Sequence, residues 1–143
     1  MKLYTFAVAP NPARVHFFLN ENVKGSEVAI DVQEVTVNFL NSEQKQPEFL
    51  ARNPAGTLPV LELDDGTCLL ESLPIMEYLE ELYPEPSLIG RSPLERARTR
   101  GVERNIEMNI LLRVIRAVHA TRSPLGLPAN PPLAENELQR LPA

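Results

Sequence analysis

Two apolar runs, residues 58–63 and 67–70, stand on either side of Asp65-Gly66. An Asp-Gly pair in this setting is a strong signal for a tight turn between antiparallel strands. The first run contains Pro59 near its start. Because proline cannot donate a ladder hydrogen bond, such a strand lies at a sheet edge or is entered through an unusual peptide bond. The sequence therefore predicts a β-hairpin whose first strand either lies at a sheet edge or is entered through an unusual peptide bond at Pro59.

The conformation of the peptide bond between Leu58 and Pro59 decides whether the backbone of Leu58 can bind a ligand. A cis peptide bond between Leu58 and Pro59 would turn the N–H and C=O of Leu58 to the solvent side of the sheet. An extended peptide ligand could then pair with Leu58 as an added strand. From the residues alone, cis is the minority state of an X–Pro bond.

Glu71 and Ser72 stand at the mouth of the helix predicted after the hairpin. The N-terminus of a helix attracts a carboxylate, and Glu71 could accept hydrogen bonds from an ammonium group. One helix end could thus hold an amino-acid head group that carries both charges. The alternative is that Ser72 is only the N-cap and Glu71 an acid favoured by the helix dipole.

Strand and helix signals alternate over residues 1–84, which we interpret as one α/β domain. We expect strands over 2–6, 28–37, 58–63 and 67–70, and helices over 12–22, 46–51 and 72–82. The order β-α-β-α-β-β-α predicts a mixed sheet covered by helices.

Residues 85–143 differ from this domain in that we expect only a linker and helices there. A proline-rich linker is followed by one long helix over 94–121, and a further helix is expected over 134–141. A single long helix with a wide apolar face cannot bury that face alone. The sequence thus predicts the opening of an all-helical domain that is incomplete in this chain.

Charge and composition exclude several classes of protein. The formal net charge of −5 argues against a basic surface for nucleic acid. The one cysteine, Cys68, allows no intrachain disulfide and is expected to be a small buried apolar residue. Two histidines and one cysteine suggest no metal site. No targeting segment or membrane-spanning run is visible, so we expect a cytoplasmic protein without a membrane partner.

Four segments together resemble the glutathione transferase family. They are "APNPARVHFFL", "PEFLARNPAGTLPVLELDDG", "ESLPIMEYLEELYP" and "SPLERARTRGVERNIE", and the likeness covers residues 1 to about 120. It implies a thioredoxin-like glutathione-binding domain followed by an all-helical domain. It also implies conjugation of the glutathione thiolate to a small electrophile, without a metal. The alternatives are a non-catalytic glutathione-binding or regulatory protein and a glutathione-dependent disulfide reductase.

The resemblance carries roles over to particular residues. Pro59 is expected to be cis, and Leu58 to bind the cysteinyl backbone of glutathione. Glu71 and Ser72 are expected to hold the γ-glutamyl head group. Gln44 is expected to reach the glycine end, with Lys45 beside it as a partner for the carboxylate. A homodimer is also implied, with contacts expected from Met76, Leu79 and Tyr83.

The residue that activates the thiol is where this chain departs from the family pattern. The usual Ser or Cys position falls on Ala9, which has no hydrogen-bond donor. Asn11 lies in the same loop and carries an amide, so we expect it to act together with the first helix's own N–H groups. Thr5 and Tyr4 are the nearest hydroxyls, but they are predicted to lie in the strand. For Asn11 the alternative is a turn residue favoured before a helix.

Overall fold

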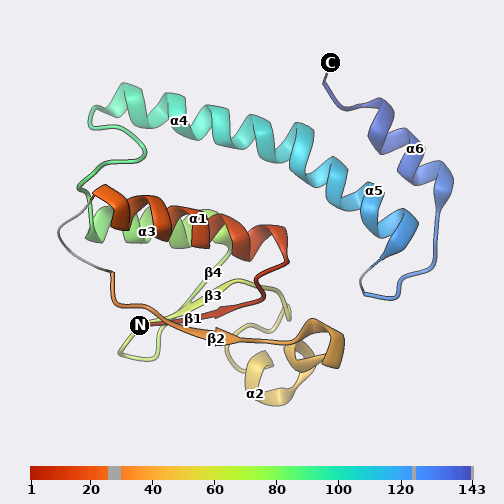
Figure 1. Ribbon diagram of the computed structural model, residues 1–143, viewed down its shortest axis with the longest axis horizontal. Coiled ribbons are helices and arrows are strands. Elements are labelled where there is room, and N and C mark those ends of the chain that lie inside the picture. Colours follow the sequence, from red (N-terminus) through yellow and green to blue (C-terminus); the bar gives the residue numbers. More distant parts are fainter. Residues whose placement is uncertain (26–29, 124, 143) are drawn as a thin grey trace. The chain divides into compact units, whose positions relative to one another are not determined.

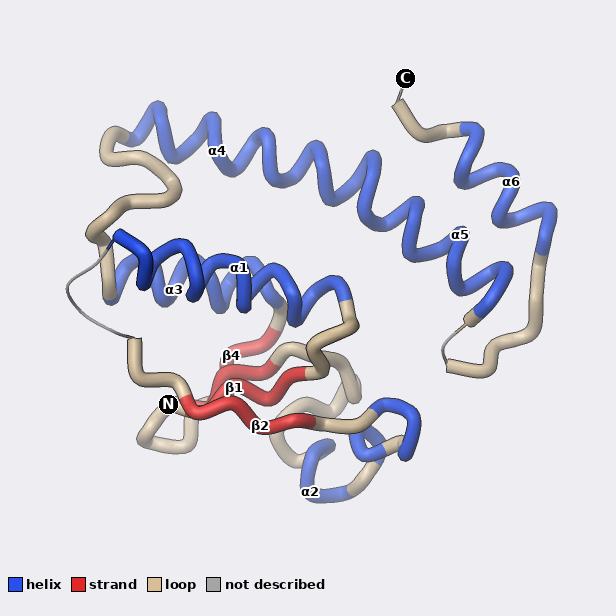
Figure 2. Tube along the Cα trace, in the orientation of Figure 1, coloured by secondary structure: helices blue, strands red, loops and turns tan. Residues whose placement is uncertain are grey.

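The computed structural model describes residues 1–25, 30–123 and 125–142. The chain divides into two compact units, Met1–Leu88 and Ile89–Ala143. Figure 2 shows every strand of the described residues in the first unit, and only helices and loops in the second. The boundary that the sequence predicts, residue 84, lies just before this division.

The first unit is built on a four-stranded mixed sheet with the order β2-β1-β3-β4 (Figure 1). Its strands are β1 (Lys2–Thr5), β2 (Gln33–Thr36), β3 (Val60–Glu62) and β4 (Cys68–Leu70). The β1–β2 pair is parallel, whereas β1–β3 and β3–β4 are antiparallel. The thioredoxin-like fold predicted from the sequence is confirmed. The predicted second strand region includes Val28, which lies outside the described residues.

Helices α1 (Pro10–Gly25) and α3 (Ser72–Leu82) lie side by side over one face of the sheet (Figure 1). Successive side chains of a strand point to opposite faces, so Leu3 and Leu61 face these helices. They form one buried cluster with helix residues Val15, Phe18, Ile75 and Leu79. Leu79 is fully buried in this core, so the expectation that it contributes to a subunit contact is wrong.

The other face of the sheet is covered by α2 (Pro47–Leu50) and the segment before it. Two 3₁₀ turns, Phe39–Asn41 and Glu43–Lys45, precede α2 and were not expected from the sequence. The second buried cluster lies here and consists of Tyr4, Val37, Phe49, Leu58 and Val60. Leu58 is therefore anchored by its side chain on this face while its backbone stays outside the strand.

The regular structure of the second unit, over its described residues, is entirely helical. Helix α4 (Pro93–Ile106), a π-helical turn (Glu107–Leu111) and α5 (Leu112–Arg122) follow one another where the sequence predicts one helix. Helix α6 (Pro131–Gln139) begins three residues before the predicted start at 134. The reason is local: the Asn130 side chain accepts a hydrogen bond from the N–H of Leu133, and proline is tolerated in a first helical turn.

Helices α5 and α6 pack through small residues. Ala117 and Ala120 of α5 and Ala134 of α6 form a buried cluster. Beside it, Arg113 lies 3.4 Å from the buried carboxylate of Glu137. Alanines on both helices allow the two backbones to approach closely, and the ion pair keeps the buried charge neutralised.

A buried acid fixes the end of the first unit. Glu80 of α3 is fully buried, and its Oε1 accepts hydrogen bonds from Ser87 Oγ at 2.9 Å and from the Leu88 N–H at 3.0 Å. A buried carboxylate needs such donors. This one fastens the segment after α3 back onto the helix.

We predict that Glu80→Ala lowers the free energy of unfolding by about 2 kcal/mol, because two donors lose their shared acceptor. Urea denaturation of the full chain measures this change. The matched control is Glu81→Ala on the same helix, where the side chain is exposed and a change within about 0.5 kcal/mol is expected. Equal losses in both variants would contradict the anchoring role.

Candidate functional site

The register of the sheet gathers several loops at one end. Tyr4 of β1 lies opposite Val60 of β3, and Val60 lies opposite Leu70 of β4. Thr5 lies opposite Thr36 at the end of the parallel strand β2. The chain therefore leaves β1, β2 and β4, and enters β3, at the same end of the sheet. Figure 1 shows the segments after β1 and β2 leaving on this side, toward α1 and α2.

The segments that adjoin the strands at this end carry every residue that the sequence predicts for the site. Asn11, expected in the loop before the first helix, is already in the first turn of α1. Asn11 follows β1, Gln44 and Lys45 follow β2, Leu58 and Pro59 precede β3, and Glu71 and Ser72 follow β4. Because side chains far apart in sequence meet only through this register, the shared location is a tertiary property.

The side chain of Leu58 is buried, whereas its backbone N–H and C=O are not used in the sheet. The Leu58–Pro59 peptide bond is cis, as the resemblance implies. The Leu58 side chain is buried in the second cluster. Among the described residues, neither its N–H nor its C=O has a hydrogen-bond partner. A buried residue with both backbone groups free is suited to pair with another extended chain.

Gln44 brings an unpartnered polar atom to the same end. The residue is 4% exposed, and its Oε1 is buried with no hydrogen-bond partner in the described part of the chain. Gly56 has φ +63°, and a Cβ atom there would lie 3.1 Å from the Gln44 backbone oxygen. Glycine thus permits close contact between the Gln44 turn and the loop that leads to Leu58. Lys45, next in the chain, is exposed.

The start of α3 differs from the expected cap. Glu71, not Ser72, is the N-cap, and no side chain caps the helix. Ser72 is the first helical residue, so its predicted capping role is wrong. Pro74 lacks an N–H, and the Ile75 N–H bonds the Glu71 carbonyl at 3.2 Å. The N–H groups of Ser72 and Leu73 therefore remain available to a ligand.

Glu71 has an unusual backbone conformation, with φ 68° and ψ 139°. A non-glycine residue pays of order 1–3 kcal/mol for such a conformation, which persists only where the surroundings impose it. Strain of this kind concentrates at ligand-binding sites. Here it is found at the turn that leads from β4 into the free amide groups of α3.

The N-terminus of α1 offers fewer backbone donors than expected. The helix begins at Pro10, and Pro12 follows two residues later, so neither position has an N–H. The Ala13 N–H already bonds the Ala9 carbonyl at 3.0 Å. The donors of this first turn are thus reduced to the backbone N–H and the side-chain amide of Asn11.

The two nearby hydroxyls are engaged elsewhere. Thr5 Oγ1 lies 2.8 Å from His16 Nε2, and His16 Nδ1 lies 3.1 Å from a Glu34 carboxylate oxygen. Thr5 is also buried under α1. The Tyr4 hydroxyl donates to Glu62 at 2.9 Å on the opposite face of the sheet. Asn11 is therefore the remaining side-chain donor among the candidates.

Comparison with known proteins agrees with this arrangement. A family model described as "Glutathione S-transferase, N-terminal domain" matches residues 3–87. The chain belongs to the glutathione S-transferase family.

Two individual relatives are similar to this transferase-family chain over most of its length. It is 44% identical over 104 residues to the maleylacetoacetate isomerase of Pseudomonas aeruginosa, covering 71% of this chain and 46% of that protein. It is 40% identical over 111 residues to glutathione S-transferase 2 of Saccharomyces cerevisiae, covering 78% of this chain and 46% of the relative. The chain thus spans about half the length of these curated relatives.

Among solved structures, Gtt2 from Saccharomyces cerevisiae superposes with a TM-score of 0.84 at 36% identity. The match covers 98% of this chain and 67% of that one. Both units of this transferase-family chain therefore have counterparts in a solved relative, including the helical second unit.

Two negative findings concern the described residues alone. No helix among them combines the length and apolar character needed to cross a bilayer. No group of three or more His, Cys, Asp or Glu side chains in that part of the chain is arranged to hold a metal ion.

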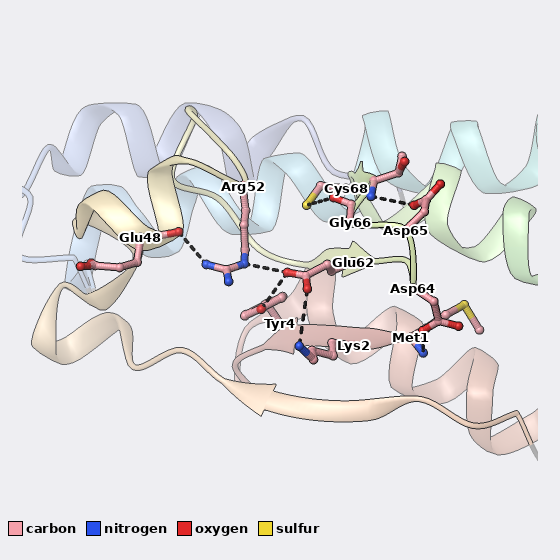
Figure 3. Close-up of polar contacts among 11 residues, drawn as sticks. Met1, Lys2, Tyr4, Glu48, Arg52, Glu62, Asp64, Asp65, Gly66 and Cys68 are labelled. Carbon is pink, nitrogen blue, oxygen red and sulfur yellow. Dashed lines mark hydrogen bonds and ion pairs between the residues drawn. The ribbon is translucent and has the colours of Figure 1, made fainter.

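One cluster of the transferase fold was missed by sequence reasoning. Figure 3 shows Arg52 reaching from the end of α2 to Glu62 on β3, with Tyr4 beside them. The Arg52 Nε donates to Glu62 at 2.8 Å, its NH1 donates to the Glu48 carbonyl at 2.6 Å, and its guanidinium lies 4.8 Å from the Tyr4 ring centroid. No local sequence motif predicts such a contact, because Arg52 and Glu62 belong to separate elements.

This cluster, Arg52–Glu62–Tyr4, ties the α2 segment to the sheet. Hydrogen bonds from Arg52 and then Tyr4 lower the pKa of Glu62, while burial and the bond to Glu62 raise the pKa of Tyr4. Burial, followed by the negative charge of Glu62, raises the pKa of the Cys68 thiol. A thiol with a raised pKa is a poor nucleophile. Cys68 is half-buried, however, and not buried as the sequence predicts.

We predict that Glu62→Gln lowers the free energy of unfolding by about 1–2 kcal/mol at neutral pH. Because the pKa of Glu62 is lower folded than unfolded, its contribution is complete above the unfolded value of about 4.3. It is lost as the pH falls through the lower folded value, so the two proteins should converge in acid.

Urea denaturation at several pH values measures this difference. The control is Glu48→Gln, since the Glu48 side chain is exposed and only its backbone carbonyl meets Arg52. A difference between Glu62→Gln and the wild type that does not shrink in acid would contradict the assignment.

Proposed function

We propose that the first unit binds glutathione and that the protein transfers the glutathione thiolate to an electrophilic carbon. The observation that carries the proposal is Leu58, whose free N–H and C=O lie at the same sheet end as Gln44, Glu71 and Ser72. In the transfer, the thiol proton passes to water and the thiolate attacks the electrophilic carbon to form a carbon–sulfur bond. Either the bond from that carbon to a leaving group breaks and the leaving group departs with the electron pair, or a carbon–carbon π bond opens and the resulting carbanion takes a proton from water.

The residues present match the chemistry of this tripeptide. The ammonium of the γ-glutamyl head suits the Glu71 carboxylate, and its carboxylate suits Ser72 and the free amides of α3. The cysteinyl N–H and C=O suit the backbone of Leu58. At the glycine end, the buried Gln44 side chain supplies an unpaired acceptor, and Lys45 can approach the carboxylate.

Activation of the sulfur is assigned to Asn11. A free thiol of this type has a pKa near ~8.5, and each unit of lowering needs ~1.4 kcal/mol of preferential thiolate stabilisation. The amide of Asn11 and its own N–H are hydrogen-bond donors at the positive end of α1. Engagement of Thr5 and Tyr4 in other hydrogen bonds supports this choice.

A second candidate activity is isomerisation of a maleyl-type keto acid. It is favoured by the 44% identity to a maleylacetoacetate isomerase. Assays of the full chain with an electrophile and with such a keto acid, each in the presence of glutathione, separate the two activities. The non-catalytic alternative would show glutathione binding without either reaction.

We predict that Ser72→Ala raises the dissociation constant for glutathione roughly tenfold, because a hydrogen bond to a carboxylate is lost. Isothermal titration calorimetry of the full chain measures it. The control is Thr99→Ala on α4, for which we expect a change within about twofold. Unchanged affinity in Ser72→Ala would remove this residue from the head-group site.

We predict that Asn11→Ala raises the pKa of bound glutathione by up to about one unit, as expected for the loss of one donor to the thiolate. The ultraviolet absorbance of the thiolate, followed against pH in the complex, gives this value. Asn11→Ser keeps a donor and should restore part of the shift. A pKa that is the same in all three proteins would exclude Asn11 from thiol activation.

A further inference from the structure

A second asparagine, Asn53, lies fully buried just before the site. It is 1% exposed, although it belongs to a loop whose next two residues, Pro54 and Ala55, are exposed. Its Oδ1 accepts from the Ala55 N–H at 3.0 Å. Its Nδ2 donates to both the C=O and the Oγ1 of Thr57, each at 2.9 Å. All of these partners lie in the loop 53–57, so this side chain shapes the loop itself.

The bond to the Thr57 carbonyl has a direct consequence for Leu58. The Thr57 C=O and the Leu58 N–H belong to one planar peptide unit, in which they point in opposite directions when the bond is trans. Fixing the C=O on Asn53 therefore aims the N–H of Leu58 away from Asn53. That N–H has no partner among the described residues, so its direction is held by the carbonyl on the other side of the peptide plane.

The same loop also reaches Gln44. The Gly56 N–H donates to the Asn53 carbonyl at 2.9 Å. Gly56 in turn lies so close to the Gln44 backbone that a Cβ atom would be 3.1 Å from the carbonyl oxygen. The loop 53–57 thus lies against the Gln44 turn and leads directly into Leu58.

We propose that Asn53 is a positioning residue, which through the loop 53–57 sets Leu58 and Gln44 at the spacing that a tripeptide ligand requires. This role rests on the glutathione binding proposed above. Asn53 does not itself touch the ligand, because its polar atoms are bonded within the loop. It acts by keeping two ligand-binding groups oriented before binding, which lowers the cost of ordering them.

The test replaces the donor and keeps the shape. Asn53→Asp retains an acceptor for the Ala55 N–H but puts a carboxylate oxygen against the Thr57 carbonyl. We expect a roughly tenfold weaker affinity for glutathione. We also expect a lower NMR order parameter at the Leu58 amide of the free protein, because its peptide plane is no longer held by Asn53. Thr57→Val removes only the bond to Oγ1, so a change within about twofold is expected.

Ligand length distinguishes positioning from general loss of stability. The dipeptide γ-glutamylcysteine lacks the glycine that Gln44 would bind, so the wild type should prefer glutathione. In Asn53→Asp this preference should shrink, because Gln44 and Leu58 are no longer held together. Equal weakening for both ligands, with an unchanged order parameter at Leu58, would overturn the proposal by showing a merely structural role.

Gly56→Ala provides a second variant that does not depend on the folding of Asn53→Asp. Its Cβ would press on the Gln44 carbonyl, and its φ of +63° would strain an alanine, so the variant should weaken glutathione more than γ-glutamylcysteine. Equal loss for both ligands would contradict the coupling through the loop.

The order parameter of the Leu58 amide separates this proposal from the proposed function. If the wild type fails to bind glutathione, the proposed function is wrong. A lower order parameter at Leu58 in Asn53→Asp would still support the positioning role, and an unchanged value would overturn it.

Discussion

The antiparallel pairing of β3 with β1 is the contact on which the rest of the first unit depends. Val60 and Leu61 are both fully buried, one facing the α2 side and the other facing α1 and α3. A slip of one residue would turn each of these side chains to the wrong face, so burial on both faces fixes the register. With Tyr4 opposite Val60, Leu58 is brought to the end of the sheet where β1 leads into α1.

The candidate site is built from free backbone groups more than from side chains. Leu58 contributes an N–H and a C=O, and the first turn of α3 contributes the N–H groups of Ser72 and Leu73. Such groups do not depend on rotamers, so their positions are as rigid as the elements that carry them. The side chains that matter most are buried: Gln44 with its unpaired Oε1, and Asn53 with its bonds inside the loop.

The two faces of the sheet are stabilised by different kinds of contact. On one face, α1 and α3 cover the larger of the two apolar clusters, which is stabilised by removal of its side chains from water. On the other, a smaller apolar cluster is joined by the Arg52–Glu62–Tyr4 contacts, which hold the α2 segment and hence the turn of Gln44. The surface proposed to bind glutathione therefore depends on polar contacts that are individually modest, so it is more easily disturbed than the core.

The sequence by itself determined the elements and their order, because their signals are local. Gly66 after Asp65 marked the hairpin, Pro12 suited the first turn of a helix, and apolar spacing marked the helices, although α1 begins two residues earlier than predicted, at Pro10. Family resemblance supplied the site residues, which the register then brought to one end of the sheet. Only the tertiary structure decided that Glu71 rather than Ser72 occupies the N-cap position of α3, and that Thr5 is bonded to His16. It alone showed that Arg52 meets Glu62, since such contacts arise from packing between separate elements and leave no periodic trace in the chain.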